Sequence, residues 1–278
     1  MENKITFDWK AESQRFDGVA NLYDTYRPGY PSGLIDDIIL ISGIQTDGRI
    51  LEIGSGTGKA TLFFARKGYT ILCLEPGQNL IDVATKNLAS FSNVSFVRSR
   101  FEEWRDDEEK FDLVISAQAY HWIPEEVRYE KTANVLKHQG YLATFWNMYP
   151  DINGKIRQEL DKVYHKRAPE LSKLETPYKQ LLETRANSFR KTPYFKKVVV
   201  RKYTWSARYK TDEYLGLLNT YSDHLSLSEQ KRGVLFEDIA EVIEKNGGFI
   251  ERPYLSVLYI AQKKGHKKQA HTKRSVGV

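Results

Sequence analysis

The sequence predicts an α/β fold built on a doubly wound, mostly parallel sheet. Residues 49–147 alternate short β-like apolar runs with helix-like segments. A glycine-rich loop joins the first run to the first helix, and the later connections are short enough to favour right-handed crossovers. The 278 residues are 41% hydrophobic and 28% charged, which supplies a buried core and excludes a disordered chain.

Five strands and three helices are expected in this central region. Proline-containing turns, Glu75-Pro76-Gly77 and Trp122-Ile123-Pro124, open the second and third helices. The expected strands are Arg49–Ile53, Thr70–Leu74, Val94–Val97, Phe111–Ser116 and Tyr141–Trp146, and the expected helices are 59–67, 78–90 and 124–137.

The flanking segments extend this core. A helix is expected at Pro31–Ile41, after a polar and aromatic arm from Phe16 to Tyr30. Apolar residues at helical spacing predict an amphipathic helix at 154–167, further helices are expected at 176–189, 211–221 and 229–245, and β-like runs at 197–205 and 253–261 bring the sheet to seven strands. The expected domains are a helical arm or lid (1–40), a cofactor-binding core (41–149), a helical insertion with the sixth strand that caps the substrate (150–225), the last helix and strand (226–262) and a disordered basic tail (263–278).

The net charge of +6 comes from the tail. Residues 263–278 hold six Lys or Arg and no acid, and removing these six from 42 leaves 36 basic against 36 acidic residues. This neutral body offers no basic groove, so we expect no nucleic-acid partner. Without a long apolar stretch or the apolar core of a signal peptide, we expect a cytoplasmic protein with no membrane contact. The single cysteine, Cys73, excludes internal disulfides and a cysteine-based zinc site, and no metal is expected.

The chemistry is concentrated in the loop after the first strand, where residues 50–61 read ILEIGSGTGKAT. Glycines that follow a strand leave backbone N–H groups open to a close-lying ligand. A phosphate-binding P-loop would need glycine at Ile53 and a hydroxyl at Ala60, and a dinucleotide loop would need glycine or alanine at Lys59. ATP, GTP and NAD therefore match this loop poorly.

Two carboxylates distinguish the site further. Glu52, two residues before the first glycine, would repel a pyrophosphate but suits a ligand with an ammonium group. Glu75, at the end of the second strand, can accept hydrogen bonds from both ribose hydroxyls. Glu75 alone would fit NAD equally well, so its pairing with Glu52 favours a ribose-containing ligand that also carries an ammonium group.

These motifs resemble the class I S-adenosylmethionine-dependent methyltransferases, which share a Rossmann-like sheet. The resemblance is carried by LEIGSGTG at 51–58, LEP at 74–76 and FDLVIS at 111–116. Within that superfamily, FDGVANLYDTYRPGYP at 16–31, AQAYHW at 117–122 and YLGLLNTYS at 214–222 resemble the small-molecule branch of trans-aconitate-type (type 11) methyltransferases. The family implies a seven-stranded sheet with an antiparallel last strand.

The resemblance also implies cofactor contacts. The arm would fold over the ligand, with Arg27 clamping a carboxylate of the cofactor or of the substrate, unless Arg27 forms only a surface salt bridge. Many members hold the adenine amino group with an acidic residue where this chain has Arg100, so the backbone at Phe101 and the nearby Glu102 are expected to replace it. The S-adenosylmethionine contacts expected are Tyr23, Arg27, Glu52, Gly54, Ser55, Gly56, Gly58, Glu75, Phe101, Glu102, Ala117 and Gln118.

The acceptor site is expected beside the ends of the fourth and fifth strands. Methyl transfer from a sulfonium is an in-line displacement, so alignment in a dry pocket suffices for a carboxylate, whereas a phenol, amine or carbon acid benefits from a base. His121 is the candidate base, although a packing role fits a lone histidine beside tryptophan equally well. The residues expected to contact the acceptor are Tyr26, His121, Trp122, Trp146 and Tyr221, with Asn147, Met148, Tyr149 and His224 nearby.

The leading hypothesis is therefore a small-molecule methyltransferase that uses S-adenosylmethionine. The alternatives are a non-catalytic protein that binds S-adenosylmethionine or S-adenosylhomocysteine and, less favoured by Lys59, an NAD-dependent oxidoreductase. A monomer is expected, and a dimer is compatible with the sequence.

Overall fold

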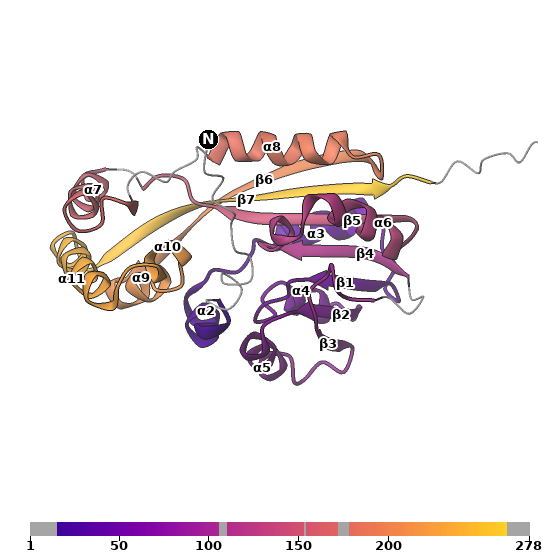
Figure 1. Ribbon diagram of the computed structural model, residues 1–278, viewed down its shortest axis with the longest axis horizontal. Helices are drawn as coiled ribbons and strands as arrows, with labels where there is room; N and C mark the ends of the chain where they lie inside the picture. Colours follow the sequence, from indigo (N-terminus) through magenta and orange to yellow (C-terminus); the bar gives the residue numbers. More distant parts are fainter. Residues whose placement is uncertain (1–15, 106–109, 153, 172–177, 266–278) are drawn as a thin grey trace, which may run out of the picture.

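The computed structural model describes residues 16–105, 110–152, 154–171 and 178–265. Within them, one sheet of seven strands has the order β3-β2-β1-β4-β5-β7-β6 (Figure 1). The strands are β1 (Arg49–Ile53), β2 (Thr70–Glu75), β3 (Val94–Arg98), β4 (Phe111–Ala117), β5 (Leu136–Met148), β6 (Phe195–Lys210) and β7 (Phe249–Lys263). Strands β1 to β5 pair in parallel, and β7 lies antiparallel between β5 and β6. The predicted mostly parallel sheet with an antiparallel last strand is confirmed.

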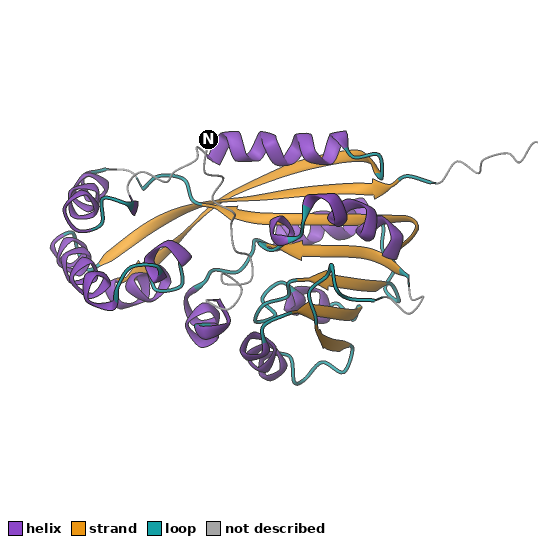
Figure 2. Cartoon of the chain, viewed as in Figure 1, coloured by secondary structure: helices purple, strands orange, loops and turns teal. Residues whose placement is uncertain are grey.

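Helices cover both faces of the sheet (Figure 2). One face packs against α3 and α4, and the other packs against α6 and α8, so the central strands are apolar throughout rather than alternating. The helices are α2 (Ala20–Tyr26), α3 (Ser32–Ser42), α4 (Thr61–Ala65), α5 (Gln78–Asn87), the short 3-10 helix η1 (Tyr120–Trp122), α6 (Glu125–Val135), α7 (Lys155–Arg167), α8 (Tyr178–Lys191), α9 (Thr211–Leu218), α10 (Ser222–Leu225) and α11 (Glu229–Lys245).

Several predicted boundaries change. The helix expected at 124–137 ends at Val135, because Leu136 already pairs with Phe111 at the start of β5. The helix expected at 59–67 shortens to α4, and the one expected at 211–221 divides into α9 and α10. Strands β6 and β7 are much longer than the apolar runs that predicted them, because their pairing continues through polar residues as far as Lys210 with Phe249.

The extended ends of β6 and β7 carry a separate helical cluster of α7, α9, α10 and α11, at the left of Figure 1. Apolar residues of α7, α9 and α11 form one core with Tyr209, Ile250 and Tyr254 of the two strands. The predicted division between 150–225 and 226–262 therefore runs through this core, because α11 packs with α7 and α9. By contrast, α8 leaves this cluster and lies on the sheet.

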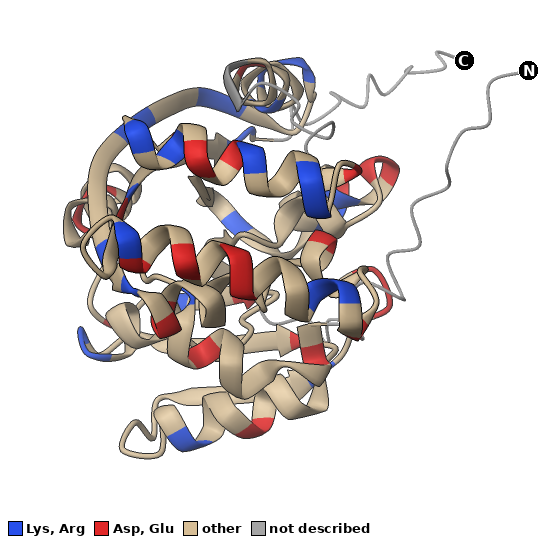
Figure 3. Ribbon diagram, turned by 90° about the vertical axis from the view of Figure 1, so that its left-hand side faces the viewer, with Lys and Arg blue, Asp and Glu red and all other residues tan. Residues whose placement is uncertain are grey.

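The predicted tail begins within the sheet. Lys263 is the last residue of β7 and donates from Nζ to the carbonyl of Leu136, and residues 266–278 lie outside the described residues. On the face shown in Figure 3, Lys and Arg are interspersed with Asp and Glu. No helix in the described ranges is long and apolar enough to span a bilayer.

Candidate functional site

A cavity of about 420 Å³ opens where the parallel strands β1, β2, β4 and β5 end. This volume lies in the range of small-molecule sites, and the carboxyl edge of a doubly wound sheet is where such folds bind ligands. A smaller recess adjoins it and reaches under the arm to Glu52. The cavity and the recess share Tyr23, Arg27, Gly54, Gly56, Ala117, Gln118, Asn147 and Tyr149.

The three loop glycines have different surroundings. Gly54, Gly56 and Gly58 all have positive φ, which favours glycine at each. A Cβ at Gly54 would overlap Ala119, and one at Gly58 would lie 2.8 Å from Leu88 Cδ1. A Cβ at Gly56 would meet nothing within 4 Å, although Gly56 lines the cavity and the recess. Gly56 is therefore the glycine that keeps space open for a ligand, while Gly58, a predicted contact, permits packing instead.

Glu75 is the carboxylate nearest the glycine loop. Its Oε2 accepts from the Gly56 N–H at 2.9 Å, and its Oε1 accepts from the Gly77 N–H at 3.0 Å. Its side chain is 6% exposed, and burial raises its pKa to about 7 despite these two hydrogen bonds. Each oxygen retains a lone pair, so the carboxylate can also accept from hydroxyl groups in the cavity.

Glu52 lies deeper, in the wall of the recess. Its Oε2 accepts from Thr61 Oγ1 at 2.7 Å, while Oε1 is buried with no partner among the described residues. Burial raises its pKa to about 8. A buried carboxylate oxygen without a donor costs free energy, which a ligand with an ammonium group would recover.

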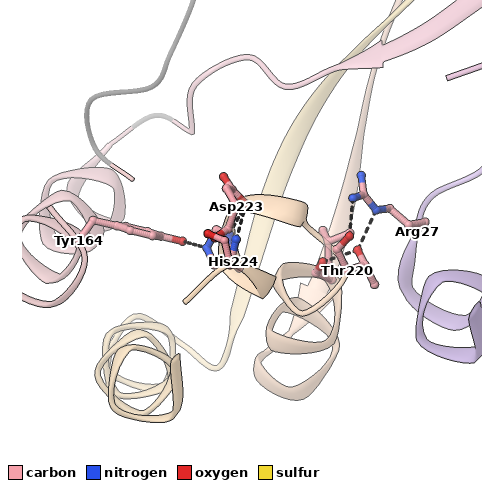
Figure 4. A network of polar contacts seen from close by, with 7 residues as sticks. Arg27, Tyr164, Thr220, Asp223 and His224 are labelled. Carbon is pink, nitrogen blue, oxygen red and sulfur yellow. Dashed lines mark hydrogen bonds and ion pairs between the residues drawn. The ribbon is translucent and has the colours of Figure 1, made fainter. Parts of the chain in front are cut away.

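The arm closes over this recess through Arg27. Its guanidinium donates to Thr220 (Figure 4). It also donates to the Tyr149 hydroxyl at 2.8 Å and lies 4.2 Å from the ring centroid of Tyr221. Among the described residues, no carboxylate pairs with Arg27, in contrast to the surface salt bridge considered for it. Tyr23, one helical turn earlier, also lines the cavity.

The remaining predicted cofactor residues also reach the site. Phe101 and Glu102 line the cavity beyond β3, and Glu102 lies 3.8 Å from Arg100. Ala117 and Gln118 line it after β4, and Gln118 has a positive φ of 61°, a strained conformation that is common at functional sites. Ser55 lies in the recess with its hydroxyl buried and unpartnered among the described residues.

His121, Trp122 and Trp146 meet on the side of β4 and β5. Trp146 Nε1–H donates to His121 Nδ1 at 3.2 Å, which leaves the proton of the neutral ring on Nε2. Burial, reinforced by Arg185 and Arg128, lowers the pKa of His121 to about 3. The candidate base His121 is therefore a poor proton acceptor, because its surroundings disfavour a second proton.

Two predicted acceptor contacts, Tyr26 and Tyr221, and the nearby His224 do not line the cavity. The Tyr26 ring packs against Gly216 of α9, where even a Cβ would overlap it, and is not part of the cavity lining. Tyr221 stacks behind Arg27, and His224 is buried between Tyr164 and Asp223, at 2.8 Å and 2.7 Å (Figure 4). The aromatic residues near the site thus include a second group that supports the arm.

Sequence reasoning missed Leu80 of α5 and Leu181 and Arg185 of α8. The sequence pattern of α8 did not indicate a role in the site, because only two of its residues face the cavity and its other apolar residues pack on the sheet. No group of three or more His, Cys, Asp or Glu residues that could hold a metal occurs in the described segments.

The comparisons with known proteins agree with this geometry. Residues 50–140 match the family described as a methyltransferase domain. An uncharacterised methyltransferase of Mycobacterium tuberculosis is 28% identical over 52% of this chain and 57% of its own length, so the match spans little more than half of that relative. An uncharacterised methyltransferase of Schizosaccharomyces pombe is 24% identical over 87% of this chain and 94% of its own length.

Solved structures share the fold. A methyltransferase from Thiobacillus denitrificans, described as S-adenosylmethionine-dependent and solved with S-adenosylhomocysteine, has a TM-score of 0.52 and 15% identity over 88% of this chain and 98% of that chain. At this identity the likeness concerns the fold alone. None of the reported matches singles out the trans-aconitate-type branch, which stays a prediction.

Proposed function

We propose that this chain, which carries a methyltransferase domain on the class I methyltransferase fold, binds S-adenosylmethionine in the cavity and transfers its methyl group to a small-molecule acceptor. The observation that carries the proposal is the pairing of Glu52 with Glu75 around a glycine loop whose central glycine leaves the ligand space open. We propose this activity for the whole protein as well.

The recess suits the amino-acid end of the ligand. Glu52 offers an unpartnered oxygen to the ammonium group, and Arg27, which has no carboxylate partner among the described residues, is available for the ligand's carboxylate. Both groups line the same recess, with Gly54 and Gly56 between them. A zwitterion fits this arrangement better than a pyrophosphate, which has no ammonium group to pair with Glu52.

The larger cavity suits the nucleoside. Glu75 would accept from the ribose hydroxyls with its remaining lone pairs, while Leu80 and Phe101 supply apolar surface for a base. Glu102 lies at this end of the cavity and can accept from an amino group. These groups are the predicted contacts of the adenosine portion.

The acceptor would enter beside His121, Trp122 and Trp146. S-adenosylmethionine supplies an electrophilic methyl group on a sulfonium, and the protein aligns the acceptor with it and excludes water. Because His121 is held neutral and its pKa lies near 3, it donates from Nε2 rather than removing a proton. The site therefore favours an acceptor that is already ionised, such as a carboxylate.

Calorimetric titration tests the proposal. The purified protein would be titrated with S-adenosylhomocysteine, with NADH and ATP as parallel controls. We expect S-adenosylhomocysteine alone to bind with measurable affinity, and turnover would then be sought with a panel of small carboxylic acids. Binding of NADH or ATP in its place would contradict the assignment of the loop from Glu52 to Lys59.

A further inference from the structure

Arg185 lies in the cavity wall beside β5 and β7. The glycine loop follows β1, which is separated from β5 by β4 in the sheet. Arg185 comes from α8, whose residues Leu182 and Phe189 pack on the sheet. The neighbouring turn of α8 presents Leu181 and Arg185, four residues apart, to the cavity. The Arg185 guanidinium carbon lies 4.0 Å from the ring centroid of Trp146.

Among the described residues, no carboxylate pairs with the guanidinium of Arg185. Its one hydrogen-bond acceptor in the described chain is the sulfur of Met148, a weak acceptor 3.9 Å from Nη1. Burial lowers the pKa of Arg185 to about 10, and the nearby Arg128 disfavours its charge further, yet the group stays cationic at neutral pH. A partly buried cation is costly without a counter-charge, so the cavity wall holds an unsatisfied site for an anion.

The cavity lining carries the cations Arg27, Arg100 and Arg185, and Arg100 pairs with Glu102. The carboxylates in the lining are Glu75, which ends β2, and Glu102, which follows β3, and they lie at the end expected to hold the nucleoside. At the other end, Arg185 is joined by the neutral His121, whose Nε2–H is a further donor. Trp146 lies between these two groups, with its indole N–H bonded to His121 and its ring under Arg185.

We propose that Arg185 determines specificity for an anionic acceptor, whose oxyanion it binds while Trp122 and Trp146 hold the acceptor's apolar body. The inference rests on the proposed function, because it places the acceptor beside the methyl donor. A guanidinium forms two parallel N–H bonds to the paired oxygens of a carboxylate, a phosphonate or a phosphate. Arg185 binds and orients the acceptor, and no proton moves to or from it.

Binding to the S-adenosylhomocysteine-loaded protein tests this inference. The probes share one aromatic body and differ in charge: phenylacetate, benzylphosphonate, neutral phenylacetamide and cationic phenethylamine. Tryptophan fluorescence would follow each titration, since Trp122 and Trp146 line the cavity. We expect at least one anion to bind about tenfold more tightly than the amide, and the better of the two anions identifies the class of acceptor.

Variants of Arg185 test whether its charge, rather than the stability of the protein, causes the preference for anions. Arg185→Met should bring anion and amide to within about twofold, while Arg185→Lys should retain part of the preference. Arg190→Met is the matched control, because Arg190 lies on the exposed side of the same helix and bonds Asn187. It should leave the preference unchanged. Thermal unfolding would confirm that each variant is folded.

The outcomes distinguish the two proposals. Failure of S-adenosylhomocysteine to bind the wild-type protein would overturn the proposed function. Normal binding of S-adenosylhomocysteine with no anion bound more tightly than the amide would overturn the role of Arg185 alone. A preference that survives in Arg185→Met would overturn it as well.

Discussion

Arg27 donates to both oxygens of Thr220, from Nε to Oγ1 at 2.7 Å and from Nη2 to the carbonyl at 2.8 Å, across 193 residues of sequence. Thr220 lies just beyond α9, in the helical cluster, whereas Arg27 ends the arm helix α2 above the recess. The same guanidinium bonds Tyr149 after β5. One side chain therefore connects the arm, the sheet and the helical cluster at the point where a ligand carboxylate is expected.

Arg27→Met should weaken S-adenosylhomocysteine binding by about 1.5 to 3 kcal/mol, because a charge-assisted contact to the ligand is lost. It should also lower the thermal midpoint, since Thr220 and Tyr149 lose a shared donor. Calorimetry and thermal unfolding would measure the two effects. Thr220→Val is the control: it removes one hydroxyl but leaves the carbonyl contact, so affinity should change by less than about threefold. Equal losses of affinity in both variants would contradict a direct contact from Arg27.

Gly56→Ala and Gly58→Ala should separate binding from folding. At Gly56 the added methyl group meets open space, so we expect a stability cost of about 1 kcal/mol from the positive φ and a large loss of S-adenosylhomocysteine affinity. At Gly58 the methyl group meets the buried Leu88, which adds about 1 to 3 kcal/mol of overpacking to the same strain. Chemical denaturation and calorimetry on both variants test this contrast. A Gly56→Ala protein that binds normally would place the ligand elsewhere.

Affinity for S-adenosylhomocysteine should rise with pH between about 6 and 8.5. Burial raises the pKa of Glu75 to about 7 and that of Glu52 to about 8, so both carboxylates bind protons near neutrality in the free protein. The ligand's hydroxyls and ammonium group favour the ionised forms, and at lower pH binding must release these protons. Well below each pKa, one pH unit should cost about tenfold in affinity per carboxylate.

The variant Glu75→Gln shows which part of this pH dependence of affinity is due to Glu75. It should weaken binding at pH 8 by about 1 to 3 kcal/mol and remove the part of the pH dependence centred near 7, leaving the part due to Glu52. Calorimetry in buffers of different ionisation enthalpy counts the protons released. An affinity that is flat with pH in the wild-type protein would show that neither carboxylate ionises on binding.

The sequence predicted the sheet and the cofactor end of the site because both depend on local patterns. Apolar runs identify β1 and β2, and Glu52 and Glu75 are fixed relative to those runs. The roles of the arm residues were harder to predict. No helix or strand was predicted within residues 16–30, so Tyr23, Tyr26 and Arg27 look equivalent in the sequence. In the helix α2, residues four apart share a face, so Tyr23 and Arg27 reach the cavity while Tyr26 turns to Gly216.

The acceptor end of the site could not be predicted from the sequence, because it depends on tertiary contacts that no local pattern encodes. Arg185 reaches the cavity only because α8 lies on β7 and β6 rather than in the helical cluster. The burial of His121 against Trp146 likewise joins segments 25 residues apart. Residue type alone predicted a titrating histidine, and its packed environment reverses that expectation.

His121 should remain neutral between pH 5 and 8. Burial and the nearby cations Arg185 and Arg128 oppose a second proton, and Nδ1 is occupied by the Trp146 N–H. Long-range nitrogen–proton NMR spectra of the imidazoles would show one ring, assigned by its absence in His121→Gln, with constant shifts typical of the Nε2–H form. A midpoint near 6.5 for His121 would mean that its environment opens in solution, and it would restore His121 as a candidate general base.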